Sequence, residues 1–254
     1  MFIKLLLVSL SLAVCLVSGE EEVDITKGPP DYDKPWVEGW GFNKSDHQCW
    51  KKQHEHMLKQ TKEHGSKIKV LFFGDSKTAR FLSEGKAVWD EHYANKGCYN
   101  YGVRGDSTRQ LLWRMHHKEF EGLAPKITIL NVGGNNFKSN YNRGTDDEII
   151  KAFKAIIKGL REMMPKSELV IVGELPRKSK TDERARYIND ALMKEYNESS
   201  DKMIHFVDIF PKYRTNKDKQ NLKLFIDDGF HLNEEGYKVL AHILDPIIKK
   251  LLKE

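Results

Sequence analysis

A regular alternation after Gly65 constrains the fold of this 254-residue chain more than any other feature of its sequence. Short apolar runs, each suited to a buried strand, take turns with longer stretches of helical periodicity. Strands that are apolar along their whole length are typical of parallel sheets, because helices cover both faces of such sheets. The sequence therefore predicts an α/β domain with a mainly parallel sheet. The predicted strands cover residues 68–73, 98–102, 126–132, 168–173 and 204–209, of which 98–102 has the weakest pattern.

The helical stretches include one with clear boundaries. It places Ile149 and Phe153 on one face, begins at the capping box 145–148 and stops before Pro165. A second amphipathic helix is predicted after Asn233.

Residues 47–64 also have the pattern of a helix, with a polar face. His54 and His56 are two residues apart, a spacing that splays them on a helix. We therefore interpret them as solvated side chains and not as metal ligands.

The first 19 residues have the features of a secretory signal peptide: an early Lys4, an apolar run over residues 5–17, and small residues before an acidic pair. We expect this segment to be removed and the product to be soluble and secreted, since no later apolar run is long enough for a membrane span. Residues 20–64 are predicted to be an N-terminal segment that packs on the domain through its tryptophans, and the main domain covers residues 65–254.

Two further patterns are relevant if the chain follows a secretory route. Asn43 and Asn197 each begin an N-glycosylation acceptor sequence. Cys49 and Cys98 remain after the signal is removed, so a disulfide between them is one possibility, although spacing alone cannot establish its geometry.

The charge of the chain is spread along its length. The formal net charge is +5, from 42 Lys and Arg against 37 Asp and Glu. No concentrated basic patch with interleaved aromatics stands out, so we do not expect a nucleic-acid partner. The local basic stretches at 177–180 and 212–223 are interpreted as solvated loops, with attraction of an anionic substrate or surface as the alternative. The sequence does not indicate the oligomeric state.

Four unusual loops follow the predicted strands or precede the last helix. In parallel α/β sheets, ligands gather beyond the carboxyl ends of the strands, where such loops lie. The pattern therefore predicts that Ser76, Gly105, Asn135 and the pair Asp228 and His231 converge. The four loops are GDSKT (74–78), VRGDST (103–108), GGNNF (133–137) and DDGFHL (227–232).

This ordered set resembles the SGNH, or GDSL-type, hydrolase superfamily, from about residue 68 onward. The stretches GVRGDSTRQLLWRM, GGNN, ELPR and HLNEEGY look most like the branch that contains the catalytic subunits of intracellular platelet-activating-factor acetylhydrolase. The resemblance implies a flavodoxin-like three-layer α/β/α sandwich with a mainly parallel five-stranded sheet. It also implies a serine esterase that needs no metal or cofactor and acts on a short acyl ester, with acetyl the expected group, on a lipid or an O-acetylated glycan.

Each residue has a chemical role in this hypothesis. Ser76 is the nucleophile, His231 accepts and returns its proton, and Asp228 holds the imidazole. The backbone N–H groups of Ser76 and Gly105 and the side-chain amide of Asn135 form the oxyanion hole.

The triplet Gly-Asp-Ser occurs twice, at 74–76 and 105–107. Ser76 follows the most hydrophobic strand, whereas Ser107 stands at a helix start, where we read it with Asp106 as helix capping. The competing hypothesis is a non-catalytic secreted binding or adhesion protein that displays its basic loops or Arg104-Gly105-Asp106. Taken singly, the serine, asparagine and aspartates also suit helix caps and turns, and a lone histidine is more often structural. The complete set favours the esterase.

Overall fold

The computed structural model describes residues 44–137, 145–178 and 181–253, with side chains from Trp50 onward. The predicted signal peptide, the acceptor Asn43 and the side chain of Cys49 lie outside the described residues, so these predictions remain predictions.

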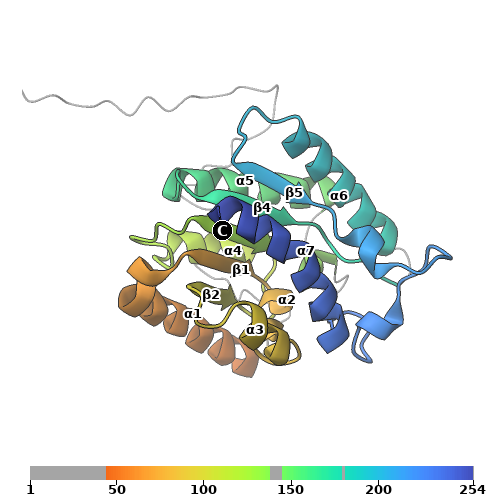
Figure 1. The fold of residues 1–254 in the computed structure, drawn as a ribbon, viewed down its shortest axis with the longest axis horizontal. Helices are drawn as coiled ribbons and strands as arrows, with labels where there is room; N and C mark the ends of the chain where they lie inside the picture. The colour runs from red at the N-terminus through yellow and green to blue at the C-terminus, as the bar shows by residue number, and fades with distance from the viewer. Residues whose placement is uncertain (1–43, 138–144, 179–180, 254) are drawn as a thin grey trace, which may run out of the picture.

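One parallel sheet holds all five predicted strands, in the order β2-β1-β3-β4-β5 (Figure 1). This is the flavodoxin-like strand order. The central strands β1 and β3 are buried along their whole length, as their continuous apolar sequences predict. The predicted fold class is therefore confirmed. The strands are β1 Val70–Gly74, β2 Cys98–Gly102, β3 Ile127–Asn131, β4 Glu168–Val172 and β5 Ile204–Val207.

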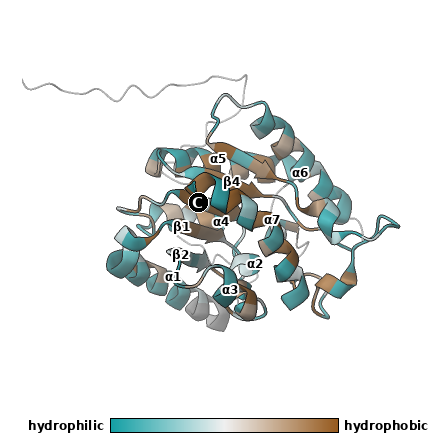
Figure 2. Cartoon of the chain, viewed as in Figure 1, coloured by the Kyte–Doolittle hydropathy of each residue, from teal (hydrophilic) through white to brown (hydrophobic). Residues whose placement is uncertain are grey.

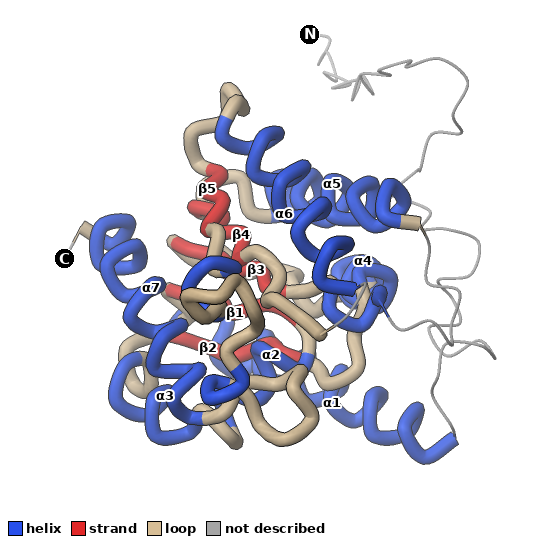
Figure 3. Tube along the Cα trace, turned by 90° about the vertical axis from the view of Figure 1, so that its right-hand side faces the viewer, coloured by secondary structure: helices blue, strands red, loops and turns tan. Residues whose placement is uncertain are grey.

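Helices cover the sheet on both sides (Figure 3). Side chains of α1, α4, α5 and α6 form one buried core, and those of α3 and α7 form the other. Hydrophobic residues gather on the strands while the outer helix faces are hydrophilic (Figure 2). None of the described helices has an apolar stretch that could span a membrane. The helices are α1 Lys44–His64, α2 Ser76–Ala79, α3 Lys86–His92, α4 Thr108–His116, α5 Asp146–Met163, α6 Thr181–Asn197 and α7 Glu234–Leu252.

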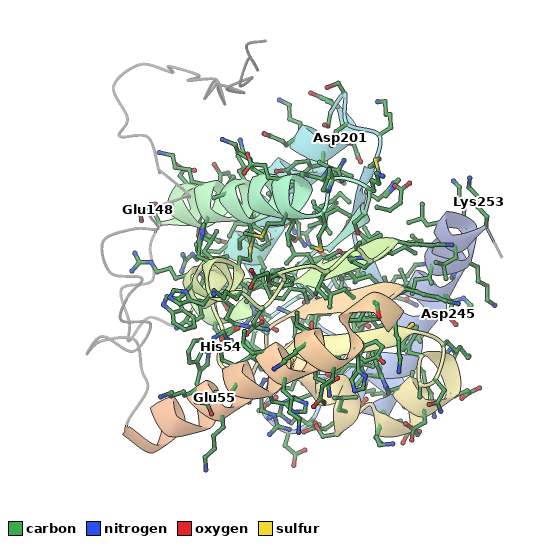
Figure 4. All side chains as sticks on the ribbon, turned by 90° about the vertical axis from the view of Figure 1, so that its left-hand side faces the viewer. His54, Glu55, Glu148, Asp201, Asp245 and Lys253 are labelled. Atoms are coloured by element: carbon green, nitrogen blue, oxygen red, sulfur yellow. The ribbon has the colours of Figure 1, made fainter. Side chains whose placement is uncertain are left out.

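Helix α1 joins the first core through Trp50 and Met57. His54 lies between α1 and the body of the domain, whereas its neighbour Glu55 points away (Figure 4). The interpretation of His54 as a solvated side chain is wrong. The side chain of His54 is only 7% exposed, and its Nδ1 lies 2.5 Å from Oε1 of the buried Glu119. A buried carboxylate is stable only with hydrogen-bonding partners, and His54 is one of the partners of Glu119.

Candidate active site

The carboxyl ends of β1, β2 and β3 are joined by backbone hydrogen bonds just where the unusual loops begin. Val103 N donates to Gly74 O (3.0 Å), and Asp75 N donates to Asn131 O (3.1 Å). Only glycine fits at position 74, since a Cβ there would lie 2.1 Å from Asn131 O. Three loops that are distant in sequence therefore start side by side.

Ser76 is the first residue of α2, on the turn directly after β1. Asp75 is its N-cap residue and accepts a hydrogen bond from Lys77 N (2.8 Å), so the carboxylate fixes the turn. The Oγ of Ser76 lies 2.9 Å from Nε2 of His231. Two residues that are 155 positions apart are thus within hydrogen-bond distance.

Asp228 holds His231 from the loop before α7. Its Oδ2 lies 2.5 Å from His231 Nδ1, and its Oδ1 accepts from the backbone N–H of Phe230 (2.8 Å) and His231 (2.9 Å). Burial by itself would raise the pKa of Asp228, but these hydrogen bonds hold it below its usual value. Burial lowers the pKa of His231, although Asp228 opposes the shift. His231 is therefore poised as a neutral base.

The two remaining predicted site residues lie on the neighbouring loops. Gly105 has φ +86°, a conformation that L side chains rarely adopt. The side chain of Asn135 donates from Nδ2 to the carbonyl of Asp106 (2.8 Å), which ties the third loop to the second. This bond orients the side-chain amide of Asn135 within the loop. Asn136 holds the same junction by exchanging hydrogen bonds with Thr108.

The second Gly-Asp-Ser triplet is structural. Ser107 is the N-cap residue of α4 and forms a capping box with Gln110, whose Oε1 accepts from the N–H (2.9 Å) and from the hydroxyl of Ser107. Asp106 does not cap. Its carboxylate accepts from Trp50 Nε1 (2.6 Å) and from Arg114 Nη1 (2.7 Å).

Asp106 is fully buried, and burial raises its pKa to about 7 against the opposing charge of Arg114. An adhesion motif must offer its carboxylate to a partner. The Arg-Gly-Asp interpretation is therefore wrong for this chain.

The sequence patterns did not predict the contacts of three charged residues near the site, Lys77, Glu174 and Arg177. Lys77 is buried and donates to Asp75 Oδ2 (3.1 Å) and Glu174 Oε1 (2.7 Å). Arg177 Nη2 donates to Glu174 Oε2 (2.9 Å), and its side chain is nine-tenths buried, so the interpretation of this residue as part of a solvated loop is wrong. One signal was available, because Glu174 lies just beyond the end of β4, where site residues gather.

Two other predicted sites lie away from this edge. Asn197 is exposed at the last residue of α6. Cys98 begins β2 and packs partly buried against the core formed with α3 and α7.

The sheet is parallel and has the flavodoxin-like strand order, and at its carboxyl edge a serine, a histidine and an aspartate lie within hydrogen-bond distance in series. This combination defines the class of SGNH-type hydrolases. A model of the GDSL-like Lipase/Acylhydrolase family matches residues 72–239, and the chain belongs to this family. The fourth letter of GDSL stands for leucine, and Lys77 occupies that place here.

Relatives and solved structures agree with this assignment. The chain is 28% identical to platelet-activating factor acetylhydrolase IB subunit alpha1 of Rattus norvegicus over 244 residues, 94% of each chain. It is 30% identical to the alpha2 subunit of Homo sapiens over 131 residues, 52% of this chain and 53% of that one.

Two solved structures share the fold. A GDSL-like lipase from Bacteroides thetaiotaomicron has a TM-score of 0.64 at 17% identity, covering 79% of this chain and 97% of that one. A family 3 carbohydrate esterase from Talaromyces cellulolyticus has a TM-score of 0.51 at 17% identity, covering 73% and 98%.

Proposed function

We propose that the chain is a secreted serine esterase that releases a short acyl group, with acetyl the expected group, through an acyl-enzyme intermediate. The observation that carries the proposal is the series Ser76–His231–Asp228, with distances of 2.9 and 2.5 Å. A serine hydroxyl is a weak nucleophile near neutral pH, so it needs a base at this distance.

In the first half-reaction, Ser76 Oγ attacks the ester carbonyl carbon while His231 Nε2 accepts the hydroxyl proton. Asp228 stabilises the resulting imidazolium. His231 then gives the proton to the leaving alcohol as the carbon–oxygen bond breaks. In the second half-reaction a water attacks the acyl-enzyme, with His231 again as base, and the acid and the free serine are released.

The negative charge of each tetrahedral intermediate falls on the former carbonyl oxygen. The proposed donors are the backbone N–H groups of Ser76 and Gly105 and the side-chain amide of Asn135. Such donors are effective because they are oriented before the reaction begins. Loss of one costs about 10² to 10³ in kcat.

The loop that carries Asn135 is closely packed at Gly134. A side chain on the preceding Gly134 would meet Arg177 Nη2 at 2.7 Å and both Lys77 Nζ and Phe230 Cζ at 3.1 Å. The names of the relatives point to an acetylated lipid, and the carbohydrate esterase fold extends the proposal to an O-acetylated glycan.

Secretion is proposed from the N-terminal apolar run, and the exposed acceptor Asn197 is compatible with glycosylation on that route.

The test is intact-mass analysis of the purified protein after treatment with a fluorophosphonate. One adduct is expected on the wild type and on Ser107→Ala, and none on Ser76→Ala. Hydrolysis of acetylated lipids is then compared with that of acetylated sugars. A folded wild type that forms no adduct contradicts the esterase and returns the non-catalytic binding protein to consideration.

A further inference from the structure

A chain of buried ion pairs runs beneath the candidate active site. Lys77, directly after the nucleophile, is 2% exposed. Its ammonium lies between the carboxylates of Asp75 and Glu174, and Glu174 uses its second oxygen for Arg177. Both oxygens of Glu174 are thus engaged, one from the nucleophile loop and one from the loop after β4.

Glu174 is itself held rigidly. Its N–H donates to Asn189 Oδ1 (2.7 Å), and its carbonyl accepts from Asn189 Nδ2 (3.0 Å), so α6 fixes the backbone of this residue. Burial alone would raise the pKa of Glu174, but Lys77 and Arg177 hold it below its usual value. The carboxylate is therefore a fixed negative centre between two cations.

Arg177 extends the chain to the histidine loop. Its guanidinium lies 4.8 Å from the ring centroid of Phe137 and 4.3 Å from that of Phe230. The ring of Phe230 meets the imidazole of His231 edge to face, with centroids 4.7 Å apart. A shift of the guanidinium would therefore disturb the packing against the base.

The same groups border the loop that carries Asn135. A Cβ at Gly133 would lie 2.9 Å from Glu174 Oε1, and one at Gly134 would lie 2.7 Å from Arg177 Nη2. The ion pairs thus touch the nucleophile, oxyanion and histidine loops at once.

We propose that Lys77, Glu174 and Arg177 are positioning residues that set the relative places of Ser76, Asn135 and His231. This inference rests on the proposed function. A misplacement of about 1 Å can cost about 10²-fold in rate, so the ion pairs act on kcat more than on KM.

The test uses Glu174→Gln, which has nearly the same shape, and the double variant Lys77→Met with Glu174→Gln, which removes one charge of each sign. The control is Lys154→Met with Glu195→Gln, an exposed pair with a separation of 2.7 Å. Each variant is assayed for kcat, KM, thermal unfolding and the rate of fluorophosphonate inactivation, with an acetyl ester as substrate.

We expect Glu174→Gln to lower kcat about 10-fold to 100-fold with KM changed less than about 3-fold. The double variant should not recover kcat, because it leaves Asp75 and Arg177 without these ion pairs and does not restore the link between the loops. The control should match the wild type.

Wild-type kcat in folded Glu174→Gln, or full recovery of kcat in the double variant, overturns the positioning role. If Glu174→Gln does not fold, the kcat of the double variant is the deciding measurement. A wild type that neither labels nor hydrolyses the ester overturns the proposed function instead, so the two failures are distinguishable.

Discussion

The two Gly-Asp-Ser triplets have the same letters and lie on neighbouring loops, but their residues make different contacts. In the first, the aspartate caps a turn and the serine meets a histidine. In the second, the serine is the N-cap residue and the aspartate is buried in an ion pair with Arg114. A three-residue motif therefore does not determine what its residues do.

The difference arises from the distance to the end of a strand. Gly74 and Gly102 are paired as the last residues of β1 and β2. Ser76 comes only two residues after Gly74, so its hydroxyl remains at the edge of the sheet. Ser107 comes five residues after Gly102, beyond a turn through Gly105, and is the N-cap residue before α4.

The first triplet should be essential for chemistry. Ser76→Ala is expected to lower kcat by at least about 10⁴-fold, since no other group replaces the nucleophile. Ester hydrolysis by purified protein is the measurement, with thermal unfolding to show that the fold is retained. Activity of Ser76→Ala near the wild-type level would show that the first triplet is no more essential for chemistry than the second.

The second triplet should be essential for stability. Asp106→Asn removes one of the two carboxylates that pair with the fully buried Arg114, the other being Glu119, and is expected to lower the free energy of unfolding by about 2 to 3 kcal/mol. Denaturant unfolding measures this. The matched control is Asp218→Asn, which alters the partner of Arg214 at an aspartate side chain that is 75% exposed and should cost less than about 1 kcal/mol. Equal effects would show that the Asp106 pair does not support the domain.

Loss of the second serine should have a smaller effect. Ser107→Ala removes an N-cap and is expected to cost about 1 kcal/mol of stability while kcat is unchanged. The same unfolding and hydrolysis measurements apply. A large fall in kcat with intact stability would indicate that Ser107 takes part in the reaction.

The smallest expected effect is a shift in pH dependence. Because burial lowers the pKa of His231, the imidazole stays neutral to lower pH than usual. A neutral imidazole is the active base, so kcat/KM should rise with pH through a midpoint below 6.5 in both the wild type and Ser107→Ala. A midpoint at or above 6.5 would contradict this account of the first triplet.

Sequence patterns predicted the strands and the convergence of the loops because apolar runs and strand ends obey local rules. All five predicted strands form, including the weak one at Cys98–Gly102. The buried polar contacts were not predictable in the same way. His54 was interpreted as solvated because its partner Glu119 is remote in sequence. Arg177 was interpreted as part of a solvated loop, although it and its partner Glu174 both belong to the stretch ELPR. Whether a charged side chain is exposed depends on what faces it in the fold.

The last helix has a consequence for biosynthesis. The hydroxyl of Tyr237, in the first turn of α7, donates to the carbonyl of Lys77 (2.7 Å), so this helix docks on the turn that carries Ser76 and also follows the loop that carries His231. A ribosome makes Ser76 long before His231. We expect the growing chain to be catalytically inert until α7 has been synthesised and docked. The chain would therefore not hydrolyse an ester during its own synthesis.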